Sequence, residues 1–353
     1  MNKKTKFARN GALLIGGIAG LKNAVEQYQS SAPGEPFHWD RFFMAILKGG
    51  FWGGVGGFAL GAICDYQNSL EAPINTDKYL LAFVRENVLR KDDPIYLQLN
   101  KKAELLANLL KRRFSDEVKA VPYKYGSSEN GTGLKDHADI DLCMECYPGS
   151  FASLEVMYFS VKDFLKSLVG SHGIVRIREQ RVSIGVYFFI REEEYKIDVT
   201  PKKLTYNSSK DTSGFLHLNK GGIFKGIGRT KTNVRLLKTI QLSEPQKKIL
   251  LVLKKIKESN NLPLASSLLQ LFVLYTYDAY RGSIPSTLTK KVLLVLQYIA
   301  DNIESIVIRS PENTNNVLTD SLTSAQKSQI HSTCREIIEE YDYQANSILG
   351  YLD

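Results

Sequence analysis

Hydrophobic positions along the chain follow different periods in different regions. Between residues 76 and 117, and again from about 232 to the end, apolar side chains recur at i, i+3, i+4 and i+7, which is typical of amphipathic helices. Between about 118 and 199 they alternate with polar residues or form short apolar runs, which favour β-strands. Residues 1–75 instead contain two glycine-rich apolar stretches. The pattern predicts an α+β core, a helical C-terminal domain and a separate N-terminal segment.

Breaks in these patterns give the expected elements and domains. Pro94 predicts a boundary between two helices, because proline cannot continue the backbone ladder of a helix. Pro122 is tolerable in a strand only at an edge or an end. Strands are expected at 118–125, 139–146, 173–179, 182–190 and 195–199, and helices at 151–169, 245–258, 263–280, 286–304 and 322–346. The predicted domains are residues 1–75, 76–231 and 232–353.

The two apolar stretches of the N-terminal segment, residues 11–21 and 42–64, allow three interpretations. They would form a membrane hairpin, because the second is about as long as the roughly 20 residues that a bilayer requires, although Lys48 is costly there. They would alternatively form a glycine-rich helical hairpin that packs closely in a homo-oligomer. Plain core packing is the third interpretation, and the sequence leaves the choice open.

Composition narrows the picture only slightly. The formal net charge of +9 suits a polyanionic ligand such as a nucleotide, and equally an anionic membrane surface. Four cysteines are too few for a disulfide scaffold and indicate a reducing compartment. We therefore expect a cytoplasmic protein, with membrane association as the alternative if residues 11–64 contact a membrane.

Candidate chemistry lies in residues 126–142, which read GSSENGTGLKDHADIDL. Gly126 and Ser127 directly follow a predicted strand, and Asp139 and Asp141 lie on the next one. Residues i and i+2 of a strand project to the same face, so both carboxylates point together while their neighbours face the core. Their mutual repulsion makes a poor structural feature, and a bound divalent cation relieves it.

A third carboxylate, Asp198, lies between two apolar residues in the later strand sequence KIDVTP. If the two strands are neighbours, the carboxylates of Asp139, Asp141 and Asp198 converge as two-metal phosphoryl transfer requires. The sequence thus predicts two Mg²⁺ ions, with Mn²⁺ as a substitute. Gly126 would let the backbone approach a triphosphate, and the amide and hydroxyl of Ser127 would donate hydrogen bonds to it.

In this order the residues resemble the DNA polymerase β-type nucleotidyltransferase superfamily. The spacer GTGLKDHADIDL is similar to its bacterial antiphage branch, the CD-NTases, which are related to cGAS and the oligoadenylate synthases. The sequence NVRLLK at 233–238 and the lysine-rich segment 247–257 resemble the helix that carries lysines against the triphosphate, and residues 262–273 and 310–317 resemble C-terminal helical motifs. The resemblance covers about residues 76–346 and implies a polymerase-β-like core of mixed sheet and helices.

The resemblance implies an enzyme that polymerises NTPs or dNTPs into an oligonucleotide signal, cyclic or linear, in antiphage defence. A separately encoded effector would respond to the product. Asp139 and Asp141 would bind metal, and Asp198 would complete the site and help deprotonate the acceptor hydroxyl. Lys254 or Lys255 would contact the phosphates. Tyr275 and Tyr277 are candidates for base stacking, although core packing is the simpler interpretation.

The N-terminal segment departs from the usual family plan and leaves the product open. Some antiphage nucleotidyltransferases, of the Hailong type, make short DNA oligomers primed by a tyrosine hydroxyl near their own C-terminus. This chain ends LGYLD, so Tyr351 is a candidate primer in its own or a neighbour's active site, against the plain interpretation of a docked or disordered tail. A non-catalytic nucleotide-binding module docked at a membrane is the alternative from a different class. A transferase that modifies a small molecule or a protein is a third.

Overall fold

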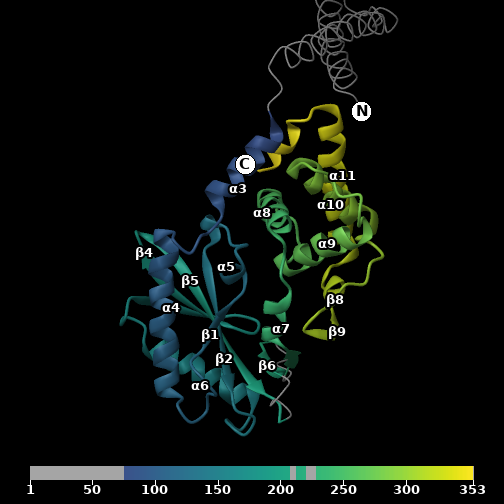
Figure 1. Cartoon of the computed structure of the whole chain (residues 1–353). Helices are drawn as coiled ribbons and strands as arrows, with labels where there is room; N and C mark the ends of the chain where they lie inside the picture. Colours follow the sequence, from purple (N-terminus) through teal and green to yellow (C-terminus); the bar gives the residue numbers. More distant parts are fainter. Residues whose placement is uncertain (1–74, 207–211, 220–227, 353) are drawn as a thin grey trace, which may run out of the picture. The chain divides into compact units, whose positions relative to one another are not determined.

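A mixed β-sheet and a group of packed helices form the two lobes of the described chain (Figure 1). The computed structural model describes residues 75–206, 212–219 and 228–352. Both glycine-rich stretches lie outside these residues, so their membrane, oligomerisation and core interpretations stay predictions. Asn75–Asp353 forms one compact unit that includes both lobes. No helix among the described residues is long and apolar enough to span a bilayer.

The sheet has seven strands and places two of them, β2 and β5, side by side and parallel. The strand order is β1-β2-β5-β4-β3, and β6 and β7 continue from β5 as an antiparallel extension. The strands are β1 (Tyr123–Tyr125), β2 (Asp139–Cys146), β3 (Ile174–Glu179), β4 (Ile184–Ile190), β5 (Glu193–Leu204), β6 (Gly214–Leu218) and β7 (Gly228–Thr232). A central parallel pair in an otherwise antiparallel sheet brings the middles of two distant segments into register.

Two helices, α4 (Pro94–Arg113) and α6 (Leu154–Ser167), pack their apolar stripes against one face of this sheet (Figure 1). Pro94 is the first residue of α4, where its missing amide costs no hydrogen bond. The side chain of Asp93 caps the helix by accepting from the amide of Ile95 at 2.9 Å. The break predicted at Pro94 is therefore confirmed, because α3 (Thr76–Asn87) ends before it.

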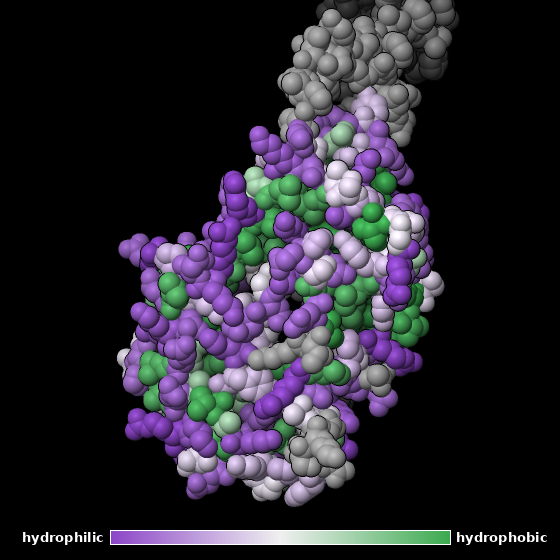
Figure 2. Space-filling model, in the orientation of Figure 1, coloured by the Kyte–Doolittle hydropathy of each residue, from purple (hydrophilic) through white to green (hydrophobic). Residues whose placement is uncertain are grey.

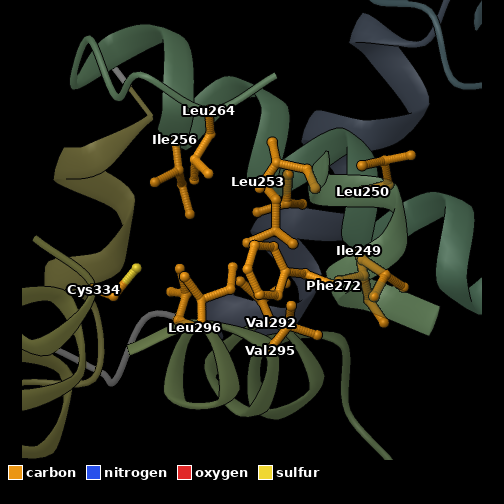
Figure 3. Close-up of a cluster of buried hydrophobic side chains, with 14 of the residues drawn as sticks. Ile249, Leu250, Leu253, Ile256, Leu264, Phe272, Val292, Val295, Leu296 and Cys334 are labelled. Carbon is orange, nitrogen blue, oxygen red and sulfur yellow. The ribbon is translucent and has the colours of Figure 1, made fainter. Parts of the chain in front are cut away.

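The helical lobe has its own apolar core (Figure 3). Phe272 of α9 is fully buried beside Ile249 of α8 and Val292 of α10. Ser243 and Gln246 cap the start of α8 reciprocally, which satisfies amides that the helix leaves free. The elements are α8 (Glu244–Ser259), α9 (Ser266–Ala279), α10 (Leu288–Asn302) and α11 (Ser324–Tyr343), with the shorter α5 (Ser127–Asn130), α7 (Val234–Thr239), η1 (Lys135–His137), η2 (Leu318–Ser321), η3 (Ser347–Tyr351), β8 (Arg309–Ser310) and β9 (Asn313–Val317).

Three expectations from the sequence need correction. The strand predicted at 118–125 is limited to Tyr123–Tyr125 at the edge of the sheet, because Pro122 cannot donate to the ladder. The strand predicted at 195–199 extends over Glu193–Leu204. Residues 310–317, which resemble a helical motif, form most of a β-hairpin in which Ser310 pairs with Asn313 and Pro311 occupies the turn.

Candidate active site

The parallel pairing of β2 and β5 gathers the three predicted carboxylates. Asp141 lies directly opposite Asp198 in the register, and Asp139 is two residues earlier on the same face of β2. Ile140 and Leu142 alternate with them and are 0% and 1% exposed on the face covered by α4 and α6. The sequence folds this way because strand alternation separates apolar from acidic side chains residue by residue.

Gly126 lies between β1 and α5, where the backbone passes close to the acidic face. Its φ of 83° lies in the region that favours glycine. A Cβ built at this position would lie 2.0 Å from Oδ2 of Asp141, so no other residue fits there without moving the carboxylate. Ser127 follows as the first residue of α5. The Gly-Ser pair therefore lies against one of the acidic residues, as the predicted phosphate cradle requires.

A cavity of about 360 Å³ lies between the two lobes at these residues, within the range of small-molecule sites. Figure 2 shows a hollow between the lobes that both hydrophilic and hydrophobic side chains border. The sheet lobe lines the cavity with Tyr125, Gly126, Ser127, Asn130, Thr132, Asp139 and Asp141. The helical lobe lines it with Ile240, Leu250, Lys254, Ser266, Ser267, Gln270 and Leu271 and with Ser310, Pro311, Glu312 and Leu318 around the β8–β9 hairpin.

The structure distinguishes the two candidate lysines. Lys254 is buried, lines the cavity and donates from Nζ to the carbonyl oxygen of Thr132 at 2.6 Å. Burial lowers the pKa of Lys254 to about 8, against the opposing attraction of Asp139. Lys255 is half-buried and is absent from the cavity lining, because one residue along a helix rotates a side chain by about 100°. Sequence reasoning could not choose between them.

Burial and crowding make the carboxylates electrostatically unusual. Burial, followed by the like charges of Asp139 and Asp198, raises the pKa of Asp141 to about 8. Burial also raises the pKa of Asp139, although Lys196 opposes this shift. Acidic side chains in one water-poor place disfavour ionisation unless a cation joins them. Such perturbed groups at the wall of a cavity are typical of functional sites.

The acidic residues have the chemistry of a divalent metal site. The donors are carboxylate oxygens, which Mg²⁺ prefers. Burial raises the pKa values of Asp139 and Asp141, and a cation beside them would favour their ionised forms. As the side chains stand, no three His, Cys, Asp or Glu residues within the described ranges are arranged to hold a metal. An ammonium is there instead: Nζ of Lys196 lies 2.8 Å from Oδ2 of Asp198 and 3.8 Å from Oδ2 of Asp139. The three carboxylates therefore suit a divalent ion in their chemistry and in their position on one face of the sheet, and the ammonium of Lys196 lies among them.

Sequence reasoning missed two residues of this site. Lys196 lies two positions before Asp198, so strand alternation already placed it on the acidic face. Gln180, in the turn between β3 and β4, donates from Nε2 to Oδ1 of Asp198 at 2.7 Å. No pattern in the sequence marks Gln180, because its contact depends on how the hairpin folds back over β5.

The tyrosines predicted as functional lie elsewhere. The backbone carbonyl of Tyr351 accepts from Asn260 at 3.1 Å, and its side chain packs against the helical core. Burial and the neighbouring Glu340 raise the pKa of Tyr351 above its ordinary range. Tyr277 packs against the same core and Tyr275 is 37% exposed. The structure places none of the three in the cavity lining.

A mixed sheet with acidic residues on its central parallel strands faces a helical lobe across the cavity. No protein-family model matches the sequence, and no curated protein matches it. Solved structures do resemble it.

One is CdnC of E. coli MS115-1 with ATP (TM-score 0.59, 15% identity, covering 78% of this chain and 94% of that chain). Another is the CD-NTase CdnG of Bradyrhizobium diazoefficiens with GTP (TM-score 0.60, 13% identity, 77% and 92%). A third is the Cid1 poly(U) polymerase with Mg and 3′-dATP (TM-score 0.55, 13% identity, 79% and 99%). The chain thus has the fold of the CD-NTases and of the wider superfamily.

Proposed function

We propose that the protein is a metal-dependent nucleotidyltransferase that joins NTPs or dNTPs into an oligonucleotide and releases pyrophosphate. The observation that carries this proposal is the placement of Asp139, Asp141 and Asp198 on one face of β2 and β5, where Asp139 and Asp141 line a cavity of about 360 Å³ and Asp198 lies behind them, opposite Asp141. Gly126 lies against the acidic face and Lys254 comes from the opposite lobe. A triphosphate therefore finds a close backbone approach on one side and an ammonium on the other.

Each residue has a definite task in this reaction. Asp139, Asp141 and Asp198 would hold Mg²⁺ or Mn²⁺, which supplies charge neutralisation of the phosphates and activation of the attacking hydroxyl. A carboxylate oxygen of Asp198 accepts the proton of that hydroxyl as the new P–O bond forms and pyrophosphate departs. Lys254 offsets charge on the departing group, and the Gly126–Ser127 turn orients the triphosphate.

The comparisons bear on the kind of oligonucleotide that the reaction would produce. The similar proteins include DncV of Vibrio cholerae, a cyclic AMP-GMP synthase, and the Cid1 poly(U) polymerase, so the shared fold suits both cyclic and linear products. We infer an oligonucleotide signal for antiphage defence, read by a separately encoded effector, from the resemblance of residues 126–142 to the CD-NTases. Self-association and membrane contact through residues 11–64 belong to the same proposal.

Priming by Tyr351 is the second candidate route. In this structure its ring packs against the helical lobe and Asn260 binds its carbonyl. The last turn must therefore leave this position before the hydroxyl reaches an active site, in the same or a neighbouring molecule. A covalent oligomer on the protein is the specific consequence.

The test is to incubate the full chain with Mg²⁺ and each labelled NTP and dNTP, and to separate products with and without proteinase. Asp141→Asn is the inactive control, and Tyr351→Phe is paired with Tyr343→Phe, which changes an exposed tyrosine. Small, phosphatase-resistant, protein-free product indicates a cyclic signal. A protein-bound ladder that only Tyr351→Phe removes establishes the tyrosine primer. Wild-type protein that incorporates no nucleotide contradicts the proposal and favours a nucleotide-binding module.

A further inference from the structure

Both carboxylate oxygens of Asp198 already have partners in this structure. Oδ1 accepts from the amide of Gln180 at 2.7 Å, and Oδ2 contacts the ammonium of Lys196 at 2.8 Å. The same ammonium lies 3.8 Å from Oδ2 of Asp139 on the neighbouring strand. One lysine thus bridges two of the three carboxylates proposed to bind metal, and its positive charge would repel a metal ion that enters among them.

The Gln180 contact is held in place by its surroundings. The hydroxyl of Ser183 donates to Oε1 of Gln180 at 2.8 Å, and the hydroxyl of Tyr158 donates to the carbonyl of Ser183 at 3.0 Å. A Cβ at Gly185 would lie 2.9 Å from Nε2 of Gln180, so the amide lies tightly against the β4 backbone. An amide fixed from three sides positions the carboxylate and does not make room for an ion.

The Lys196 contact has the opposite character. The Lys196 side chain is 28% exposed, so one side of it is open to solvent. Its four-carbon stem is flexible, and its ammonium is a compact, strongly hydrated charge that does not demand a fixed geometry. A divalent ion attracts the same oxygens with twice the charge and coordinates several of them at once. Lys196 is therefore the partner that can leave.

We propose that Lys196 is a built-in counter-ion, which occupies the cation position of the catalytic carboxylates in the metal-free protein and is displaced when a divalent metal binds. The inference rests on the proposed function, because it assigns the metal site to the same carboxylates. It has two consequences. Lys196 stabilises the metal-free protein by compensating crowded negative charge, and it weakens metal binding, because the ion must first break the contact with Asp198.

The experiment measures Mn²⁺ binding to the metal-stripped full chain by the electron paramagnetic resonance of free Mn²⁺. Lys196→Gln is expected to bind Mn²⁺ about tenfold more tightly than wild type, which corresponds to about 1.4 kcal/mol. Its metal-free melting temperature falls, and the rise caused by Mn²⁺ is larger than in wild type. Lys196→Arg keeps the charge and remains close to wild type.

Two further variants test the role of Lys196 separately from the assignment of the metal site to the carboxylates. Lys162 lies on α6, away from the acidic face, and its ammonium pairs with Glu179 at 3.0 Å. Lys162→Gln should therefore leave Mn²⁺ affinity unchanged. Asp141→Asn weakens Mn²⁺ binding if the carboxylates are the metal site. Unchanged or weaker affinity in Lys196→Gln, while Asp141→Asn loses binding, overturns the counter-ion and leaves the metal site intact.

Binding that Asp141→Asn does not alter overturns both the metal site and the counter-ion. If Lys196→Gln is unfolded without metal, the folded fraction of the variant is measured as Mn²⁺ is added. Folding restored at lower Mn²⁺ than is needed to saturate wild type supports the counter-ion. Failure of saturating Mn²⁺ to restore folding contradicts it.

Discussion

The eight residues of β2 point alternately to the two faces of the strand, and these faces have opposite properties. On the face under α4 and α6, Ile140, Leu142 and Met144 are almost fully buried in apolar surroundings. The other face is a row of polar pairs with β5: Asp139 with Lys196, Asp141 with Asp198, Cys143 with Thr200 and Glu145 with Lys202. One strand therefore anchors the lobe by hydrophobic burial and carries the proposed metal-binding carboxylates on its other face.

Charge compensation changes along this polar row. At one end, Glu145 accepts from Lys202 at 2.7 Å, from Arg235 at 2.9 Å and from Tyr123 at 3.0 Å. At the other, the ammonium of Lys196 lies within 3.8 Å of two carboxylates, Asp198 and Asp139, which crowd Asp141. In a fully compensated cluster each buried charge depends on its partner, whereas an under-compensated cluster is available to a ligand that brings positive charge.

The largest effect is expected at the under-compensated end. Asp141→Asn should lower turnover at least about 10³-fold, because metal-ion stabilisation of a transition state is worth several kcal/mol and each 1.36 kcal/mol is tenfold. The metal-free variant should melt at or above the wild-type temperature, since ionised Asp141 is disfavoured in the fold. Rate assays and thermal melts on the same preparation measure both. Turnover above a tenth of wild type would falsify the assignment of Asp141.

Glu145→Gln tests the compensated end. It leaves the fully buried ammonium of Lys202 without its carboxylate and should destabilise the fold by about 3–5 kcal/mol in urea unfolding. The double variant Glu145→Leu/Lys202→Met should recover most of this loss, because an apolar pair replaces both charges. Asp278→Asn breaks an exposed pair with Arg281 as the control, with an expected cost below about 1 kcal/mol. Equal losses for both pairs contradict the distinction between them.

Leu142→Ala addresses the apolar face one residue from Asp141. Removing this side chain, which is 1% exposed, should cost about 2–5 kcal/mol of unfolding free energy through lost burial and an incompletely filled space. Turnover per folded molecule should remain within a few-fold of wild type, in contrast to Asp141→Asn. Leu97→Ala on the exposed side of α4 is the control and should change stability by less than about 1 kcal/mol. Loss of turnover without loss of stability would reverse the roles of the two faces.

The smallest expected effect is the pH dependence of Lys254. Its pKa of about 8 means that the ammonium loses its charge as pH rises through that value, so triphosphate affinity should fall several-fold between pH 7 and 9. Between pH 8 and 10.5 the unfolded chain binds the additional proton, so wild-type stability should rise with pH in that window.

Two variants check this interpretation. Lys254→Arg should abolish the pH dependence of affinity, because arginine stays charged. Lys254→Met should remove the rise in stability, and the neighbouring substitution Lys255→Met should alter neither profile. Identical profiles for Lys254→Arg and wild type would assign the titration to another group.

Local patterns determined much of what the structure shows. Helical periodicity predicted the long helices of both lobes, and Pro94 marked the break between α3 and α4. Strand alternation alone predicted that Asp139 and Asp141 share a face, because that relation is internal to one strand. The family resemblance was misleading at residues 310–317, where Pro311 lies at the turn of a hairpin and not in a helical motif.

Only the tertiary structure decided which distant groups meet. The pairing of Asp141 with Asp198, the selection of Lys254 over Lys255 and the reach of Gln180 to Asp198 depend on strand register, helix rotation and hairpin placement. These are set by packing between segments far apart in the chain, which no local period encodes. The sequence by itself determined which residues share a face of each element, and the fold determined which faces meet, because burial of two separate apolar cores leaves the acidic face of the sheet toward the helical lobe.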